Sequence, residues 1–346
     1  MASADRTGST IVSESAPGFV DTAVFVTGGS GFVGGAVVDH LVESGANVRA
    51  LVRSAESKAA LADRGAIPIR GAVENRTSMV EGMSGCSTVF HVAGVNAMCP
   101  SDPGPMYRTN VDGVRTVVDA ASEAGVDRIV LTSSAATIGE PAGTIATEAT
   151  PHGPGFLSHY ARSKYLEEQV FFEEAARVGI EAVAVNPSSV QGPGRAGGST
   201  FLLRLALNAK RVVVVDTTLS IVDIDDCASG HLLAAEHGAD GARYLISGAS
   251  VTVGDAIAAL AEITGRPINP MMLPRWAAVA AYPVVAVVGL FGGERPICAE
   301  MLRTLLHGHR FDVTRSVEDL GMVYTPIGET LSRTVEWLAS EGFIER

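Results

Sequence analysis

Residues 23–45 read AVFVTGGSGFVGGAVVDHLVESG, in which a short apolar run, a glycine-rich turn and an amphipathic segment follow one another without a gap. Gly28, Gly31 and Gly34 stand at the spacing GxxGxxG. At a turn from a strand to a helix, the first glycine permits the tight turn, the second lets the backbone approach a pyrophosphate, and the third allows close packing of the helix on the strand. The free amides at the start of the helix face the anion. The stretch therefore predicts a dinucleotide-binding turn rather than an ordinary one.

The chain that follows alternates short β-branched runs with longer amphipathic segments. Besides 23–27, five runs are predicted to be strands: NVRALV at 47–52, AIPI at 66–69, STVFHVA at 87–93, RIVLTS at 128–133 and IEAVAVN at 180–186. Between them apolar residues recur three and four positions apart, as at Val111, Val114 and Val118. This alternation predicts an α/β fold, a Rossmann-type doubly wound parallel sheet with helices on both faces.

Domain boundaries are expected where this alternation changes. The sequence predicts a flexible tail at 1–20, a dinucleotide-binding Rossmann domain at 21–190, and a smaller, mainly helical substrate-binding cap at 191–221 and 249–346. Residues 222–248 are predicted to return to the Rossmann domain as a strand end, a helix and a short strand. Helices of the cap are expected near 253–264, 274–290, 297–307 and 327–340.

Composition and charge exclude several classes of function. The 346 residues carry 26 basic and 38 acidic side chains, a net charge of −12, without a basic run, so no nucleic-acid partner is expected. The first 20 residues lack the pattern of a signal peptide. The apolar stretch 276–291 is shorter than the ~20 residues that span a bilayer, so no stable membrane insertion is expected. A buried helix pair, a lid over an apolar substrate and a shallow membrane contact are its alternative interpretations.

The four cysteines are Cys86, Cys99, Cys227 and Cys298, and they show neither CxxC nor CxxxH spacing. We therefore expect no zinc or other metal site and no disulfide framework. Reduced thiols in a cytoplasmic protein agree best with this pattern.

The end of the second strand indicates which dinucleotide is bound. Proteins that prefer NAD place an acidic residue there, which binds the adenosine ribose hydroxyls. Here the strand ends in Val52, and Arg53 follows with a guanidinium that can bind a ribose 2′-phosphate, with Lys58 as a second cation. NADP is therefore the expected cofactor. NAD stays possible, because Glu56 is close enough in the sequence to act as the acidic residue.

Two segments carry the expected catalytic groups. In YARSK, Tyr160 and Lys164 are four residues apart at the start of a predicted helix and so share one face. A nearby ammonium stabilises a phenolate, which makes Tyr160 the candidate general acid for carbonyl reduction and Lys164 the group that tunes it. In LTSSAATIG at 131–139, hydroxyl residues follow a parallel strand, where ligand sites form. Ser134 is the candidate donor to the substrate oxygen, and Ser133 is the alternative.

Together with HVAG at 91–94, TNVDG around Asn110 and NPSSVQGPG at 186–194, these motifs resemble the extended short-chain dehydrogenase/reductases of the NAD-dependent epimerase/dehydratase superfamily. The resemblance extends from about residue 23 to 340 and is strongest to the dihydroflavonol-reductase-like and 3β-hydroxysteroid-dehydrogenase-like branches. It implies a catalytic set of Ser134, Tyr160 and Lys164, with Asn110 ordering the central helix and holding a relay water. It also implies a set of cofactor-binding residues: Gly28, Ser30, Gly31, Phe32, Val33, Gly34, Arg53, Lys58, Val92, Ala93, Gly94, Asn110, Thr132, Ser133, Tyr160, Lys164, Asn186, Pro187, Ser188 and Ser189.

One position departs from the family pattern. Family members commonly carry Gly-Asp-Leu after the third strand, with the aspartate on the adenine, whereas this chain reads Gly71-Ala72-Val73. The resemblance therefore implies that the adenine is held more weakly here or by other groups.

Three functions are compatible with this set of motifs. The expected one is an NADP(H)-dependent oxidoreductase that interconverts a carbonyl and a secondary alcohol on an apolar, steroid-like or aromatic small molecule. Met271, Met272, Trp276 and Tyr282 suggest the apolar substrate. A nucleotide-sugar epimerase is the alternative, for which Arg195, Arg204, Lys210 and Arg211 are the available cations, and a non-catalytic NADP sensor is a third. Ala135 and Ala136 after Ser134 disfavour a dehydratase. A homodimer is one option for the assembly.

Overall fold

A computed structural model describes residues 18–208, 212–280 and 298–344. Its centre is a seven-stranded parallel sheet in the order β10-β6-β5-β4-β1-β2-β3. The order reverses between β1 and β4, and such a switch point is where doubly wound sheets bind ligands. The predicted fold class is confirmed. The strands of this sheet are β1 (Ala23–Thr27), β2 (Asn47–Val52), β3 (Ile67–Arg70), β4 (Thr88–His91), β5 (Arg128–Thr132), β6 (Glu181–Pro187) and β10 (Arg243–Ile246).

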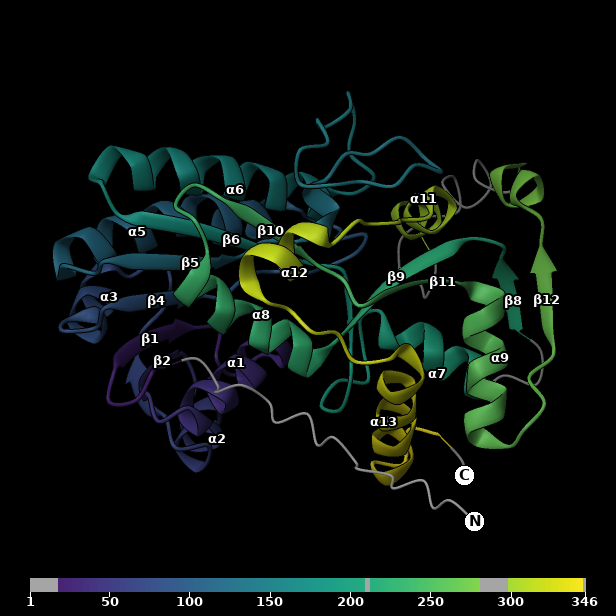
Figure 1. The fold of residues 1–346 in the computed structure, drawn as a ribbon, viewed down its shortest axis with the longest axis horizontal. Coiled ribbons are helices and arrows are strands. Elements are labelled where there is room, and N and C mark those ends of the chain that lie inside the picture. Colours follow the sequence, from purple (N-terminus) through teal and green to yellow (C-terminus); the bar gives the residue numbers. More distant parts are fainter. Residues whose placement is uncertain (1–17, 209–211, 281–297, 345–346) are drawn as a thin grey trace, which may run out of the picture.

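Two groups of helices cover the sheet (Figure 1). On one face α3, α5 and α6 pack side by side, and on the other α1 lies against α8. Buried Val, Ile, Leu and Phe side chains fill both interfaces, as the burial of a parallel sheet on both faces requires. The helices of this part of the molecule are α1 (Phe32–Glu43), α2 (Ala55–Asp63), α3 (Arg76–Met83), α4 (Gly104–Tyr107), the π-helix η1 (Arg108–Asp112), α5 (Gly113–Ala124), the 3₁₀ helix η2 (Ala135–Thr137), α6 (His159–Val178) and α8 (Ile224–His237).

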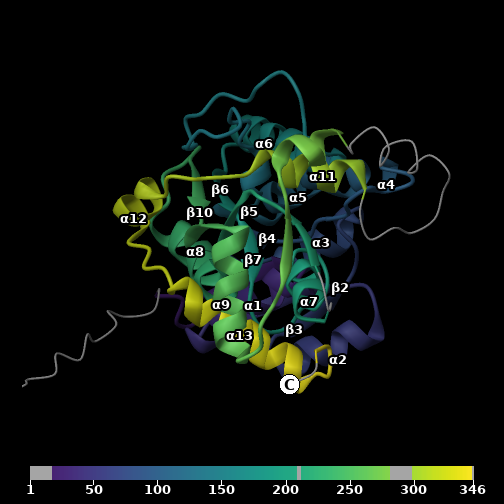
Figure 2. The same cartoon turned by 90° about the vertical axis from the view of Figure 1, so that its right-hand side faces the viewer.

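The rest of the chain forms a smaller mixed region at one end of the sheet (Figures 1 and 2). It contains a three-stranded sheet in the order β11-β9-β7 and a parallel pair β12-β8, which the sequence analysis did not predict. Its strands are β7 (Ser189–Gln191), β8 (Val212–Val215), β9 (Thr218–Asp223), β11 (Ala249–Thr252) and β12 (Pro270–Leu273). Its helices are α7 (Thr200–Asn208), α9 (Val253–Thr264), α11 (Ala299–His307) and α13 (Ile327–Ser340), whereas α12 (Thr314–Leu320) packs against α8 and β10 of the main sheet.

Residues 222–248 return to the main sheet, because β10 pairs with β6 and α8 packs on α1. The helices expected at 253–264 and 327–340 have those bounds. Only the start of the helix expected at 274–290 lies in the described residues, where 275–280 are helical, and Tyr282 and most of the tail at 1–20 lie outside them. No helix in the described residues is long and apolar enough to cross a membrane.

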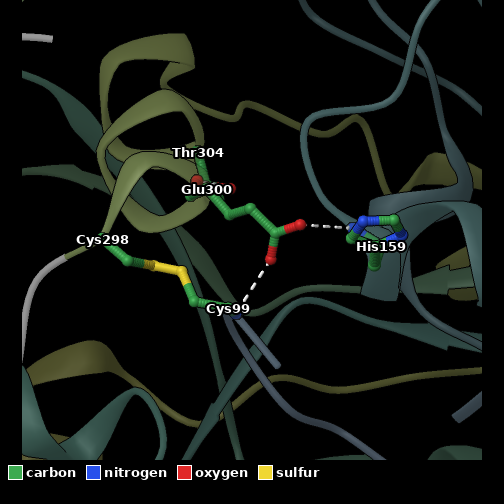
Figure 3. The surroundings of a disulfide bond; sticks show 5 residues. All are labelled: Cys99, His159, Cys298, Glu300 and Thr304. Carbon is green, nitrogen blue, oxygen red and sulfur yellow. Dashed lines mark hydrogen bonds between the residues drawn. A yellow bond between two sulfur atoms is a disulfide. The ribbon is translucent and has the colours of Figure 1, made fainter. Parts of the chain in front are cut away.

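The expectation of four reduced cysteines is wrong for two of them. Cys99, in the loop after β4, and Cys298, before α11, form a disulfide across 199 residues of sequence (Figure 3). Glu300 strengthens this connection, since its carboxylate accepts the backbone N–H of Cys99 and that of His159, both at 2.9 Å. Motif spacing could not predict this disulfide, because only the fold brings the two positions together. Cys86 and Cys227 are free and buried.

We predict that Cys99→Ser lowers the free energy of unfolding by about 2–4 kcal/mol, because the disulfide restricts the unfolded chain over a long loop. The measurement is urea unfolding of the wild type and the variant with and without reductant. Reductant should bring the wild type to the stability of Cys99→Ser and leave the variant unchanged. Equal stability of the oxidised wild type and the variant would contradict the prediction.

Candidate active site

The carboxyl ends of β1, β2, β4, β5 and β6 meet at one edge of the sheet because these strands are parallel. The candidate residues of the sequence analysis follow these strand ends or lie at the start of a helix that faces them, with Lys58 lying further along α2. The fold therefore brings together segments that are up to about 160 residues apart in the sequence.

The glycine-rich turn leaves no room for side chains at two positions. Gly28 has φ +74°, and a Cβ there would lie 2.5 Å from the nitrogen of Ala93, while a Cβ at Gly34 would lie 2.1 Å from the carbonyl oxygen of Gly28. Gly31 precedes α1 without any side-chain cap on the helix, so the amides of the first turn have no side-chain acceptor. This end of the helix offers donors and a positive dipole to an anion.

A cation lies beside this turn. The guanidinium of Arg195 is 4.5 Å from the centre of the ring of Phe32, the first residue of α1, and hydrogen bonds to the carbonyl of Val190 and the hydroxyl of Ser199 hold it in place. Its buried Nε has no partner among the described residues. Ser30, Gly31 and Phe32 also line a cavity of about 460 Å³ that continues along the outer side of α1.

At the end of β2, Arg53 is exposed and makes no ion pair within the described ranges. Ser54 caps α2 by accepting the N–H of Ser57, and Lys58 lies exposed in the next turn. After β3, Gly71 donates its N–H to the carbonyl of Val52, which places Ala72 near the end of β2 without a carboxylate.

The end of β4 is held by a buried neutral histidine. His91 Nδ1 shares a 2.7 Å hydrogen bond with the hydroxyl of Thr27 at the end of β1, and the same hydroxyl accepts the N–H of Ala93. Burial, with a further contribution from Lys164, lowers the pKa of His91 to about 3. The imidazole therefore ties β1 to β4 at the switch point without adding charge.

Asn110 lies in the π-helix η1 and is fully buried. Its Oδ1 accepts the N–H of Val95 at 2.7 Å, and its Nδ2 donates to the carbonyl of Val95 and to the hydroxyl of Ser163. Single-turn π-helices are frequent at functional sites. Here the wider turn carries an amide that joins the loop after β4 to α6. A Cβ at Gly94 would lie 3.4 Å from Asn110 Oδ1 and 3.7 Å from Lys164 Nζ.

Helix α6 presents the tyrosine and the lysine at its first turns. Ser158 caps the helix through the N–H of Ala161, Tyr160 is half-buried, and Lys164 is buried. Lys164 Nζ donates to the carbonyl of Thr132 at 2.7 Å, which fixes it at the end of β5.

Lys164 also forms an ion pair with Glu167, which is fully buried and was not predicted. Burial raises the pKa of this carboxyl to about 7, although the ammonium of Lys164 acts in the opposite direction. Lys164 and Glu167 are three residues apart on a predicted helix, and this spacing is the signal in the sequence that could have indicated their ion pair.

The two serines after β5 have different surroundings. The hydroxyl of Ser133 donates to Glu168 at 2.5 Å inside the core. The hydroxyl of Ser134 accepts the N–H of Ala136 and caps η2. Asn186 is also buried, and its Nδ2 donates to the carbonyl of Ser134 and to Glu168. Ser133 and Asn186 therefore support the position of Ser134.

The segment after β6 and the last side chain of β5 complete the edge. Ser188 donates its N–H to the carbonyl of Ile246, and Ser189 begins β7 and accepts a hydrogen bond from Gln191. The hydroxyl of Thr132 binds Nε2 of His231 at 2.7 Å, so it faces α8. Burial lowers the pKa of His231 to about 4.

A second cavity, of about 280 Å³, is lined by Ala136, two residues after Ser134, and by Ala161, the residue after Tyr160. Ile138 and Leu157 add apolar surface, whereas Glu140, His152 and His307 are polar. Met271 and Trp276 are 60% and 74% exposed and line neither of the two cavities described here. Their expected contribution to an apolar wall stays a prediction.

Three comparisons with known proteins agree with this geometry. The profile of the NAD dependent epimerase/dehydratase family matches residues 24–247. A protein of Synechocystis sp. provisionally named dihydroflavonol 4-reductase is 32% identical over 333 residues, which cover 93% of this chain and 96% of that protein. Sterol demethylase protein B of Methylococcus capsulatus is 30% identical, with 92% and 99% covered. The crystal structure of gox2253 has a TM-score of 0.82 at 30% identity, covering 94% of this chain and all of that one.

We predict that Glu167→Gln changes how stability depends on pH. Because the folded-state pKa lies above the ordinary value of 4.5, the wild type loses stability as the pH rises through about 7, and the variant lacks this loss. The free energy of unfolding of the variant minus that of the wild type should therefore rise between about pH 5 and pH 8, by roughly 1–3 kcal/mol. Urea unfolding at several pH values measures it.

Glu173→Gln, on an exposed position of the same helix, is the control and should show a constant difference from the wild type across this range. A difference for Glu167→Gln that is equally flat would show that the carboxyl does not titrate there.

Proposed function

Because the chain belongs to the NAD-dependent epimerase/dehydratase family and is an NAD(P)-dependent extended short-chain dehydrogenase/reductase, we propose that it uses NADP(H) to interconvert a carbonyl and a secondary alcohol on an apolar ring compound. The observation that carries the proposal is the position of Tyr160 and Lys164 at the start of α6, with Lys164 bound to the strand end that leads into Ser134.

The cofactor fits the sheet edge described above. The glycine turn and the uncapped start of α1 offer amides to the pyrophosphate, and Arg195 adds a positive charge beside them. Arg53 is free to bind the 2′-phosphate of NADP, and the position of Ala72 provides no carboxylate that would contact the adenine. In this proposal Val92, Ala93, Gly94 and the segment Pro187 to Ser189 would contact the cofactor between the turn and Tyr160.

The chemistry divides among three side chains. The bound nicotinamide supplies or accepts the hydride. Tyr160 gives its proton to the carbonyl oxygen during reduction and removes it during oxidation, while the Lys164 ammonium stabilises the phenolate. Ser134 donates a hydrogen bond to the same oxygen, and the buried bonds of Ser133 and Asn186 keep it in place.

The substrate proposal rests on the cavity of about 280 Å³ that is lined by Ala136 and Ala161, which are close in the chain to Ser134 and Tyr160. Its walls of Ala136, Ile138, Leu157 and Ala161 favour the burial of an apolar ring. The names of the relatives, which refer to a dihydroflavonol and a sterol, support a ring compound. Glu140 and His307 give the cavity one polar side, which suits a substrate with a polar group away from the carbonyl that reacts.

Epimerisation of a nucleotide-sugar is the alternative, and Arg195 is the cation near the turn that would serve it. An epimerase returns the hydride to its substrate, so it causes no net oxidation of NADPH. A sensor would bind NADP without turning over any substrate. Net NADPH oxidation with a hydrophobic cyclic ketone therefore separates the proposed function from both alternatives.

We predict that Tyr160→Phe lowers kcat for such a ketone by about 10²–10⁴, because the phenol hydroxyl carries the proton. The dissociation constant for NADPH should stay within about threefold of the wild type, since the ring is retained. Steady-state kinetics and fluorescence titration measure both quantities. Tyr165→Phe makes the same change on the same helix and should keep nearly full activity. Retention of more than half of kcat in Tyr160→Phe would exclude Tyr160 as the general acid.

We predict that Arg53→Glu weakens NADPH binding by about 10²-fold or more and leaves NADH binding much less affected, because it replaces a charge-assisted pair with repulsion. Arg70→Glu, an equal charge change at the exposed end of the neighbouring strand β3, is the control. Titration of the wild type and both variants with NADPH and NADH tests it. A wild type that binds NADH as tightly as NADPH would contradict the role of Arg53.

A further inference from the structure

A carboxylate and two imidazoles from distant parts of the chain lie together at the cavity of about 280 Å³, whose wall includes Glu140 and His307. Glu140 follows η2, His307 ends α11, and His309 lies two residues further on. One ligand atom from each lies within 4.8 Å of the other two. From these three residues we propose a binding site for Zn²⁺ or a divalent metal of similar preference, which goes beyond the proposed function.

The separations are close to those of a zinc site. His307 Nε2 is 3.4 Å from Glu140 Oε1, and His309 Nδ1 is 2.6 Å from the same oxygen. Bonds of about 2.0–2.1 Å to a tetrahedral Zn²⁺ separate the ligand atoms by roughly 3.3 Å. The distance from His307 Nε2 to Glu140 Oε1 already agrees with this value. The distance from His309 Nδ1 to the same oxygen would increase by less than about 1 Å when a metal replaces the hydrogen bond.

The second oxygen of the carboxylate points independently to a ligand. Glu140 is 3% exposed, and its buried Oε2 has no hydrogen-bond partner among the described residues, while Oε1 faces both imidazoles. A buried carboxylate oxygen without a partner is costly, and an ion is one of the groups that accounts for it. A metal bound to the carboxylate and both imidazoles would satisfy the whole cluster.

The surrounding residues hold the imidazoles in place. The ring of His309 stacks on Phe311 with an interplanar angle of 14°, and the two histidine rings are 4.9 Å apart between centroids. The backbone of His309 donates its N–H to Thr218 and accepts the hydroxyl of Ser220, so β9 fixes its position. Pre-organised ligands of this kind bind a metal without a large ordering cost.

The chemistry of the set favours zinc. Two imidazoles and one carboxylate match the donors found at catalytic zinc sites, which leave a fourth position open. Because Glu140 and His307 both line the cavity, this open position faces it. An oxygen donor on the substrate, such as a hydroxyl or carboxylate, is the class of group that it would take. The site also joins α11 to the loop after β5.

The test is Zn²⁺ binding to the tag-free, full-length protein, measured by competition with a chromophoric zinc chelator. We expect one Zn²⁺ per chain that is lost from Glu140→Gln, His307→Ala and His309→Ala, each with at least about 100-fold weaker affinity. His152→Ala, which changes a histidine in the same cavity outside the cluster, should bind Zn²⁺ within about threefold of the wild type. Glu140→Gln keeps the shape of the side chain, and circular dichroism establishes that each variant is folded.

X-ray absorption of the zinc-loaded wild type gives a second measurement that does not depend on the variants. It should show two imidazoles and oxygen ligands without sulfur. The proposal is overturned if the wild type binds Zn²⁺ no more tightly than His307→Ala, or if the bound zinc has thiolate ligands. Because zinc alone is the probe, either result leaves the reductase proposal as it stands.

Discussion

The carboxylate of Glu168 is the constraint on which the geometry of the site depends. It is buried in α6 and accepts hydrogen bonds from Ser133 after β5, from Asn186 on β6 and from Arg243 on β10. One charged group thus fixes a helix against three neighbouring strands. A buried charge is stable only while its partners are in place, so these elements keep a single relative position. Tyr160 and Ser134 take their places from that arrangement.

The same arrangement explains why the fold suits hydride transfer. Parallel strands bring Thr27, His91 and Thr132 to one edge, where a neutral hydrogen bond between Thr27 and His91 joins β1 to β4 and one between Thr132 and His231 joins β5 to α8. Two cations lie at this edge: Arg195 beside the glycine turn, and Lys164, which the carbonyl of Thr132 and the carboxylate of Glu167 fix at the end of β5. Binding of a dinucleotide and stabilisation of a phenolate are the two uses that the proposed function makes of them.

Much of the fold could be predicted from local pattern. The bounds of β1, β2 and β10 follow directly from short apolar runs, because a strand buried on both faces carries few charges. The glycine turn was predictable since Gly28 and Gly34 have no room for a side chain. What could not be predicted depends on contacts between distant residues. The strand β12, with the sequence PMML, has no β-branched residue to mark it, and the pairing of Cys99 with Cys298 depends on α11 packing near the loop after β4. The strand β8, by contrast, is a run of four valines, so its local pattern was sufficient to predict it.

In the candidate site, too, only the features with a local pattern could be predicted from the sequence. Tyr160 and Lys164 could be predicted because they have a local spacing. The different surroundings of the two serines could not, because Ser133 binds Glu168, 35 residues further along the chain, while Ser134 accepts a hydrogen bond within its own turn. The most direct measurement of the central claim uses NADPH with deuterium at both positions of C4 and a 3-ketosteroid as the hydrophobic cyclic ketone, followed by mass spectrometry of the product. The account predicts an alcohol that carries one deuterium for each NADPH oxidised. No deuterated alcohol with such ketones, together with epimerisation of UDP-glucose without net oxidation of the cofactor, would contradict it.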